Sequence, residues 1–384
     1  MAVSQFLRGN FIAACFAAAS FGLPAAASAA PGPASDSPLQ VIGFASIVAG
    51  RTFDSPTQAD YVGQSTIRGR NCPCYVADWT NGGVYDGDLS LSPESRAGIQ
   101  FTYTATRDLH FVAQIVTRGS QPKPSVQWAY ASYAVDSHWE VQLGRKRIPL
   151  YYYSDFQDVG TAYPWIGTPP ELYGWEVTNY NGASVRYKNK VAGVNLVTSI
   201  FGGAETAHDS PYYALYNPGQ TRVRWRDMIG ADLEGSRGPL TVRAVYMQAN
   251  VDTYNATAEI DDSARLRAYG VAANLDFDDW FVLAEATRLT RTYDAYRISG
   301  PALTVGAGYR WGNWTPFVNL SRYNENSTDR DWYDPSPYKR ASFTLRYDID
   351  GRSSVKVQVD RFLDTARNMG DNAKVVRVSY DLTF

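Results

Sequence analysis

This chain of 384 residues has little excess charge of either sign and contains few histidine and cysteine residues. Its 36 Lys and Arg nearly balance 38 Asp and Glu, so we expect no nucleic-acid partner, which would require a basic surplus. Only three His residues occur, none of them in the zinc-binding pattern H-E-x-x-H. Neither a Gly-x-Ser-x-Gly nucleophile elbow nor a phosphate-binding Gly-x-x-x-x-Gly-Lys loop is present. The sequence therefore predicts no enzyme, no metal and no cofactor.

Long hydrophobic runs are also missing, and the negative mean hydropathy excludes a polytopic helical membrane protein. Apolar residues still form 45% of the chain and aromatic residues 14%, which argues against disorder. One short apolar run, residues 11–23, follows Arg8 and precedes Ala27-Ser28-Ala29. These are the three parts of a secretory signal, and the run is short for a membrane anchor, which needs ~20 residues. We predict a signal peptide over 1–29 and a mature domain over 30–384.

Cysteine usage agrees with export. Once Cys15 leaves with the signal peptide, only Cys72 and Cys74 remain, separated by Pro73. An oxidising compartment favours a disulfide between them that holds a small loop. A two-thiol metal site is the alternative, but no His lies nearby and structural zinc takes four ligands.

The mature chain alternates apolar and polar residues over segments of roughly ten residues, as strands of membrane barrels do. In residues 339–349, Phe343 and Leu345 share one parity, and Ser342 and Arg346 share the other. Period two places the two sets on opposite faces of a sheet. We predict about sixteen such strands, over residues 40–49, 95–105, 109–118, 125–135, 138–147, 178–188, 191–201, 222–234, 239–250, 265–276, 279–290, 302–311, 313–323, 339–349, 353–363 and 374–384.

Short and long connections alternate between these strands. Gly, Asn and Asp supply short turns, for example at 189–190, while 148–177, 251–264 and 291–301 are long. Short turns at one end and long loops at the other are typical of an all-β, transmembrane antiparallel barrel with periplasmic turns. Aromatic residues recur near strand ends, as in interfacial girdles, and include Trp139, Trp225, Trp280, Tyr309 and Trp314.

The chain resembles the Gram-negative outer-membrane general porin family along nearly its whole mature length. Besides the signal peptide and the strand pattern, two local features support this resemblance. The last segment, 378–384, ends in Phe384, which is similar to the sorting signal read by the barrel assembly machinery. Residues 170–174, Pro-Glu-Leu-Tyr-Gly, are similar to the Pro-Glu-Phe-Gly-Gly stretch of the pore loop in these porins, although Leu172 and Tyr173 depart from it.

The resemblance implies a homotrimer in the outer membrane, in contact with lipid and lipopolysaccharide, whose third long loop, 148–177, folds into the lumen. Its expected constriction residues are Asp155, Asp158, Glu171, Glu176, Tyr153 and Trp165. Strand parity adds a basic lumen wall formed by Arg96, Arg118, Arg186, Arg224, Arg243, Arg310, Arg346 and Arg377. Opposed charges of this kind would orient polar solutes in a transverse field.

About sixteen strands leave a lumen too wide for side chains to fill, so we expect a water-filled channel for passive diffusion of small hydrophilic solutes and ions. The alternative is a substrate-specific channel for anions or sugars, whose stacking strip would be Tyr151, Tyr152, Tyr153, Tyr163 and Trp165. A third class is an enzyme or adhesin on a barrel scaffold, for which the sequence offers only His138 beside Ser137.

Three arginines at period two, Arg222, Arg224 and Arg226, allow two interpretations. On the lumen side they would form a basic ladder that guides anions inward. Near the outer rim they would instead pair with neighbouring acids or with lipopolysaccharide phosphates. The sequence does not choose between these interpretations.

Overall fold

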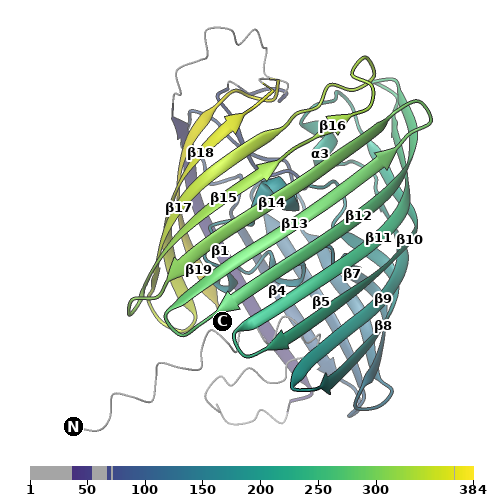
Figure 1. Ribbon diagram of the computed structural model, residues 1–384, viewed down its shortest axis with the longest axis vertical. Helices are drawn as coiled ribbons and strands as arrows, with labels where there is room; N and C mark the ends of the chain where they lie inside the picture. Colours follow the sequence, from purple (N-terminus) through teal and green to yellow (C-terminus); the bar gives the residue numbers. More distant parts are fainter. Residues whose placement is uncertain (1–36, 54–66, 71, 367) are drawn as a thin grey trace.

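The computed structural model describes residues 37–384 except 54–66, 71 and 367, and its tilted strands enclose a barrel (Figure 1). The predicted signal peptide lies outside the described residues. The strands are β1 (Leu39–Phe53), β2 (Tyr75–Asp78), β3 (Gly83–Tyr85), β4 (Arg96–Thr104), β5 (Leu109–Arg118), β6 (Ser125–Ala134), β7 (Trp139–Arg147), β8 (Asn179–Val191), β9 (Val194–Ala207), β10 (Arg222–Arg237), β11 (Leu240–Asn255), β12 (Ile260–Asp276), β13 (Trp280–Thr292), β14 (Arg297–Tyr309), β15 (Trp314–Tyr323), β16 (Asn326–Ser327), β17 (Tyr338–Asp348), β18 (Ser353–Asp364) and β19 (Ala373–Thr383).

Among the described residues, helical structure is confined to single turns in the loops. They are η1 (Ser154–Phe156), η2 (Gly160–Ala162), α2 (Pro170–Tyr173) and α3 (Pro211–Ala214). Over the described part of the chain, no helix has both the length and the apolar character needed to cross a bilayer.

Sixteen strands form the barrel wall, and the sheet closes on itself. The wall strands pair antiparallel with their neighbours in chain order, and β1 pairs with both β19 and β4. Closure leaves no free edge, so wall strands can satisfy their backbone N–H and C=O groups within the sheet, as a hydrocarbon environment requires. The predicted sixteen-strand antiparallel barrel is confirmed. The strands missed from the sequence lie in loops: the hairpin β2–β3 and the two-residue β16, which pairs with β14.

The wall strands expose apolar side chains on the outside and enclose polar ones. On β17 and β18, Phe343 and Val357 are 47% and 42% exposed, whereas Thr344 and Lys356 are 0% exposed. A lipid-facing Arg or Lys at the bilayer midplane costs ~2–4 kcal/mol, so this outer surface suits hydrocarbon. Large exposed aromatic residues gather beside the short turns, as in an interfacial girdle, and include Trp139, Trp280, Tyr309, Trp311 and Trp314.

Two of the predicted long loops are wrong because the strands continue into them. β11 and β12 remain paired up to Asn255 and Ile260, which leaves only four residues of 251–264 as a connection. β13 and β14 likewise extend to Thr292 and Arg297 within the predicted loop 291–301. In these extensions the outward residues become polar, so alternation of apolar and polar residues ends although the backbone ladder persists.

The short turn between β8 and β9 lies three residues later than predicted. Val191 pairs with Val194, so the predicted turn 189–190 belongs to β8. The turn residues are Ala192 and Gly193, with φ of 51° and 80°. Positive φ at both central positions is the geometry that matches the twist of a two-residue hairpin.

A bulge in β10 reverses the facing of its first residues. The register with β9 shifts between Trp225 and Met228, and Asp227 has a φ of 53°. Val223 and Trp225 therefore point inward and are buried, whereas Arg224 is exposed on the outer surface. The predicted lumenal position of Arg224 is wrong, and so is the outer position of Trp225. One extra residue inverts the facing of a strand, and alternation alone does not reveal it.

The facing of β17 can be tested by placing a charge on its outer side. Because Phe343 lies near the middle of the strand, Phe343→Arg should destabilise the barrel in lipid vesicles by ~2–4 kcal/mol. Urea unfolding followed by heat-modifiable gel mobility measures this change. Lys339→Arg, on the same face at the long-loop end, is the matched control and should leave stability nearly unchanged. Equal stability of the Phe343→Arg variant and the wild type would contradict a hydrocarbon-facing position.

Candidate functional site

The third long connection, between β7 and β8, folds into the barrel, as expected. Its aromatic residues pack against each other and against the inner wall. Tyr151 and Tyr173 have ring centroids 4.4 Å apart, and Trp165 meets Phe317 of β15 edge-on at 5.2 Å. Tyr153 and Trp165 are 3% and 1% exposed, so both belong to the core under the loop. The predicted sugar-stacking strip is therefore wrong for these two residues.

Cationic side chains of the wall hold the loop through its backbone carbonyl groups. Lys356 Nζ donates to the carbonyl oxygens of Gly160 and Trp165, both at 2.6 Å. Arg346 Nη1 donates to those of Thr161 and Tyr163 at 2.9 and 3.0 Å. Hydrogen bonds to charged groups are stronger than neutral ones, and those of the fully buried Lys356 are also shielded from bulk water. Wall cations therefore fix the path of the loop.

Two of the predicted constriction acids are anchors beneath the loop. Glu171 forms a bidentate pair with Arg340 of β17, at 2.9 and 3.1 Å. Glu176 pairs with Arg291 of β13 and also accepts from the Trp225 indole N–H at 3.1 Å. Both carboxylates are buried. The prediction that they face the solute path is therefore wrong, because direct ion pairs with the wall hold them in the core.

Asp158 is the centre of the charged cluster at the constriction. Arg118 Nη2 donates to its Oδ1 at 2.6 Å, and Arg147 binds the other carboxylate oxygen. Asp158 belongs to the loop, outside the membrane-spanning strands. Burial opposes its ionisation, but Arg118, Arg147 and Arg96 overcome this effect and lower the pKa of Asp158 to about 2. The carboxylate is thus ionised throughout the physiological range.

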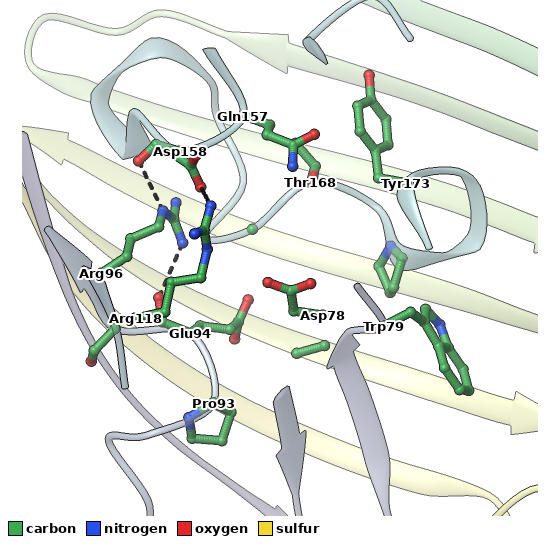
Figure 2. Close-up of a pocket in the computed structure, with 14 residues that line it drawn as sticks. Asp78, Trp79, Pro93, Glu94, Arg96, Arg118, Gln157, Asp158, Thr168 and Tyr173 are labelled. Atoms are coloured by element: carbon green, nitrogen blue, oxygen red, sulfur yellow. Dashed lines mark hydrogen bonds and ion pairs between the residues drawn. The ribbon is translucent and has the colours of Figure 1, made fainter. Parts of the chain in front are cut away.

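Polar cavities lie on either side of this cluster. The cavity toward the long loops is lined by Asp78, Glu94, Arg96, Arg118, Gln157, Asp158 and Thr168, among others (Figure 2). The cavity toward the short turns is lined by Lys146, Tyr152, Asp155, Arg186, Asp232, Glu234 and Arg243, among others. The loop segment 152–158 contributes to both linings and so forms the partition between them.

The predicted basic residues divide among distinct places. Arg96 and Arg118 border the long-loop cavity, and Arg186 and Arg243 border the short-turn cavity, together with Asp155. Arg346 holds the loop, as described above. Arg377 binds Glu94 through Nη1 at 2.7 and 2.8 Å, and Arg310 pairs with Asp276 beside a short turn at 2.7 Å.

Several residues of the site are not among the constriction and wall residues predicted above, although strand parity places Arg340 and Glu285 on the lumen side. Arg147 ends β7, Arg291 lies in the extension of β13 where alternation ends, and Arg340 lies on the polar face of β17, which alternation does identify. Glu285 of β13 accepts from the Tyr173 hydroxyl at 2.7 Å and from the Tyr152 N–H at 2.9 Å. Its partners lie more than a hundred positions away, and a strand pattern carries no information on such distant contacts.

The first long connection also enters the barrel, which the sequence analysis did not predict. In the hairpin β2–β3, Tyr75 and Tyr85 are fully buried, and Tyr75 contacts the Phe362 ring of β18. Thr80 Oγ1 donates to the Trp175 carbonyl oxygen at 2.5 Å, which joins this hairpin to the third loop. The high density of aromatic residues in 75–85 is the sequence feature that could have indicated a buried, inward position.

Cys72 and Cys74 form a disulfide just before this hairpin. The Cys74 N–H donates to the Gly370 carbonyl oxygen at 3.1 Å, so the bridged segment contacts the connection between β18 and β19. Across the described ranges, no group of three or more His, Cys, Asp or Glu residues is placed to hold a metal ion.

A closed sixteen-strand barrel with an apolar outside, a polar lumen and an inward-folded loop defines a porin-like β-barrel of the outer-membrane type. No family model matches the chain, and no curated protein matches it. Three solved structures share the fold at low identity and each covers 90% of this chain. They are the channel DcaP of Acinetobacter baumannii (14% identity, TM-score 0.59, 97% of that chain), an anion-selective porin from Comamonas acidovorans (13%, 0.56, 99%) and OmpF of Salmonella typhi (17%, 0.55, 97%).

Loss of the Asp158 charge should loosen the third loop. Asp158→Asn leaves Arg118 and Arg147 without their counter-ion, and removing one partner of a buried pair costs ~3–5 kcal/mol. Urea unfolding of the variant in vesicles measures this cost. Asp155→Asn is the matched control, because Asp155 borders the short-turn cavity and forms no ion pair within the described residues. Indistinguishable stabilities of the two variants would refute the central role of Asp158.

The pH dependence of this contribution has a definite sign. A carboxylate with a lowered pKa stabilises the fold above its unfolded-state value and loses that effect as the pH falls through its folded-state value. The Asp158 contribution should therefore persist from pH 7 to about pH 4 and disappear toward pH 2. The difference in unfolding free energy between wild type and Asp158→Asn should be similar at pH 7 and at about pH 4, and it should be smaller at about pH 2.

Proposed function

We propose that this protein is an outer-membrane channel of the porin type, which lets small hydrophilic solutes and ions diffuse passively through a water-filled lumen. The observation that carries the proposal is the pair of polar cavities on the two sides of the third loop, inside a barrel with an apolar outer surface. Charged and hydrogen-bonding walls stabilise hydrated solutes, whereas apolar solutes gain nothing there.

The substrate-specific alternative receives less support from the loop. Tyr151, Tyr153, Tyr163 and Trp165 are all buried in packing contacts, so their faces are not offered to a sugar. The cavity toward the short turns contains Tyr152 and Phe156 among charged residues of both signs. This mixed lining favours the passage of polar solutes in general over the recognition of one anion or sugar. We assign no reaction to the protein.

Conductance measurements test the proposed channel. Purified protein in a planar lipid bilayer should produce stable single-channel steps in KCl. Gln157→Trp, which fills part of the long-loop cavity, should lower the step size. Gln248→Trp, on the outer face of β11, is the control and should leave it unchanged. Silent bilayers with correctly folded wild-type protein would overturn the proposal, and equal conductance of the Gln157→Trp variant would place the solute path elsewhere.

The proposed location and partners follow from the same surface chemistry. The expected signal peptide would direct export, and Phe384 would be read by the barrel assembly machinery. Phe384 and Gly43 exchange backbone hydrogen bonds at 2.7 and 2.9 Å, so the last residue completes the pairing of β1. We also propose a homotrimer in the outer membrane, in line with the trimer form named for the similarly folded OmpT of Vibrio cholerae.

Outward-facing arginines support lipopolysaccharide as a lipid partner. The β10 bulge puts Arg224 and Arg226 on the outer surface toward the long-loop end, where Arg226 pairs with Asp252 at 2.5 Å. Arg265 and Arg267 on β12 are exposed on the same surface and form no ion pair within the described part of the chain. Such unpaired guanidinium groups at the height of the outer headgroups suit phosphate. The outer-rim interpretation of the period-two arginines is therefore the one we adopt.

Removing two of these arginines tests the lipopolysaccharide contact. The double variant Arg265→Ala and Arg267→Ala should bind less lipopolysaccharide than wild type in vesicles that contain it, most clearly at low salt because phosphate contacts are screened. Arg107→Ala, an exposed arginine beside a short turn, is the matched control for loss of a charge. Unchanged binding by the double variant would remove these arginines from the proposed contact.

A further inference from the structure

The cavity toward the long loops contains one carboxylate that no cation neutralises. Asp78, at the end of β2, accepts hydrogen bonds from the backbone N–H and the Nδ2 of Asn81 at 3.1 and 2.8 Å. Within the described residues it forms no ion pair with Lys or Arg. The other carboxylates of this cavity are neutralised, since Glu94 is bound by Arg377 and Asp158 by Arg118 and Arg147.

Asp78 is oriented for contact with a solute. Figure 2 shows its carboxylate directed into the cavity, below Gln157 and Thr168 and across from Arg118. A carboxylate offers about four acceptor positions, of which Asn81 occupies two. The side chains of Gln157 and Thr168 make no hydrogen bond within the part of the chain that the structure describes. Unused polar groups thus surround the free side of the carboxylate.

The arginines of this cavity have little capacity left for an anion. Arg96 donates through Nε to the Asp158 carbonyl oxygen at 2.9 Å and through Nη2 to the Tyr163 hydroxyl at 2.5 Å. Arg118 uses Nη1 for Ser125 at 3.1 Å and Nη2 for Asp158. The group that the cavity leaves free for a solute is therefore a carboxylate, which binds cations.

Burial supports the same interpretation. Loss of hydration raises the pKa of Asp78, and the positive charge of Arg118 only partly opposes this effect. A carboxylate held in such surroundings without a direct cationic partner gains more from an incoming cation than a solvated surface acid does.

We propose that Asp78 forms a cation-recognising subsite at the long-loop side of the constriction, for solutes that carry an ammonium or guanidinium group. The carboxylate binds the cationic group, while Gln157 and Thr168 hydrogen-bond the polar remainder of the solute. This inference rests on the proposed channel function and names the class of solute that the channel passes preferentially. It also gives the first long loop, rather than only the third, a role in selection.

Reversal potentials test this subsite. In a KCl gradient across a planar bilayer, Asp78→Asn should lower the potassium-to-chloride permeability ratio about threefold, the effect of one charge at several ångströms in a wet pore. Asp78→Glu should retain the wild-type preference. Asp88→Asn, an exposed acid of the same loop, is the matched control and should leave the ratio unchanged.

A second measurement compares two charged probes, and its first comparison is made in the wild-type protein, so that comparison does not depend on the folding of any variant. Arginine methyl ester should enter wild-type proteoliposomes faster than glutarate, and the difference should shrink in Asp78→Asn. A conducting channel with equal uptake of the two probes, or with the same permeability ratio in Asp78→Asn, would overturn the subsite while leaving the channel intact. A wild-type protein that forms no channel would overturn both.

Discussion

The constraint behind the whole structure is that backbone polar groups in hydrocarbon must find partners within the sheet. Here that constraint is met by closing the sheet, with β1 paired to both β19 and β4. Once the sheet is closed, period two decides which side chains meet lipid and which meet the lumen, except where the β10 bulge inverts the facing. The apolar outer surface, the polar cavities and the positions of the charged residues all follow from that division.

Inside the barrel, charge serves first to build the constriction. Arg340, Arg291 and Arg118 neutralise three of the acids expected to face the solute, and Lys356 and Arg346 bind the backbone of the loop. Buried ion pairs of this kind contribute geometry more than net stability, and losing one partner is costly. The electrostatic character of the path therefore depends on the few charges left unpaired, not on the total of acids and bases.

The sequence predicted the wall well and the loops poorly, for physical reasons. Apolar and polar residues alternate only where the two faces of a strand meet different environments. This pattern located every wall strand, but it did not extend into the ends of β11 to β14, where the outward residues are polar. It also failed at the β10 bulge, which placed Arg224 outside. The third loop was expected inside the lumen, yet the arginine partners of Glu171 and Glu176 were not predictable, because these ion pairs join positions more than a hundred residues apart. The inward hairpin β2–β3 was missed because a loop has no face pattern.

Site-directed spin labelling along β8 is the most direct test of the division between lipid and lumen, because Ser184 and Arg186 of this strand line the short-turn cavity. Nitroxides at 183, 185 and 187 should be accessible to oxygen dissolved in the bilayer, whereas nitroxides at 184, 186 and 188 should respond to a water-soluble nickel complex instead. A period of two in this contrast is the result we predict. Uniform accessibility along the strand, or an alternation of opposite phase, would contradict the account.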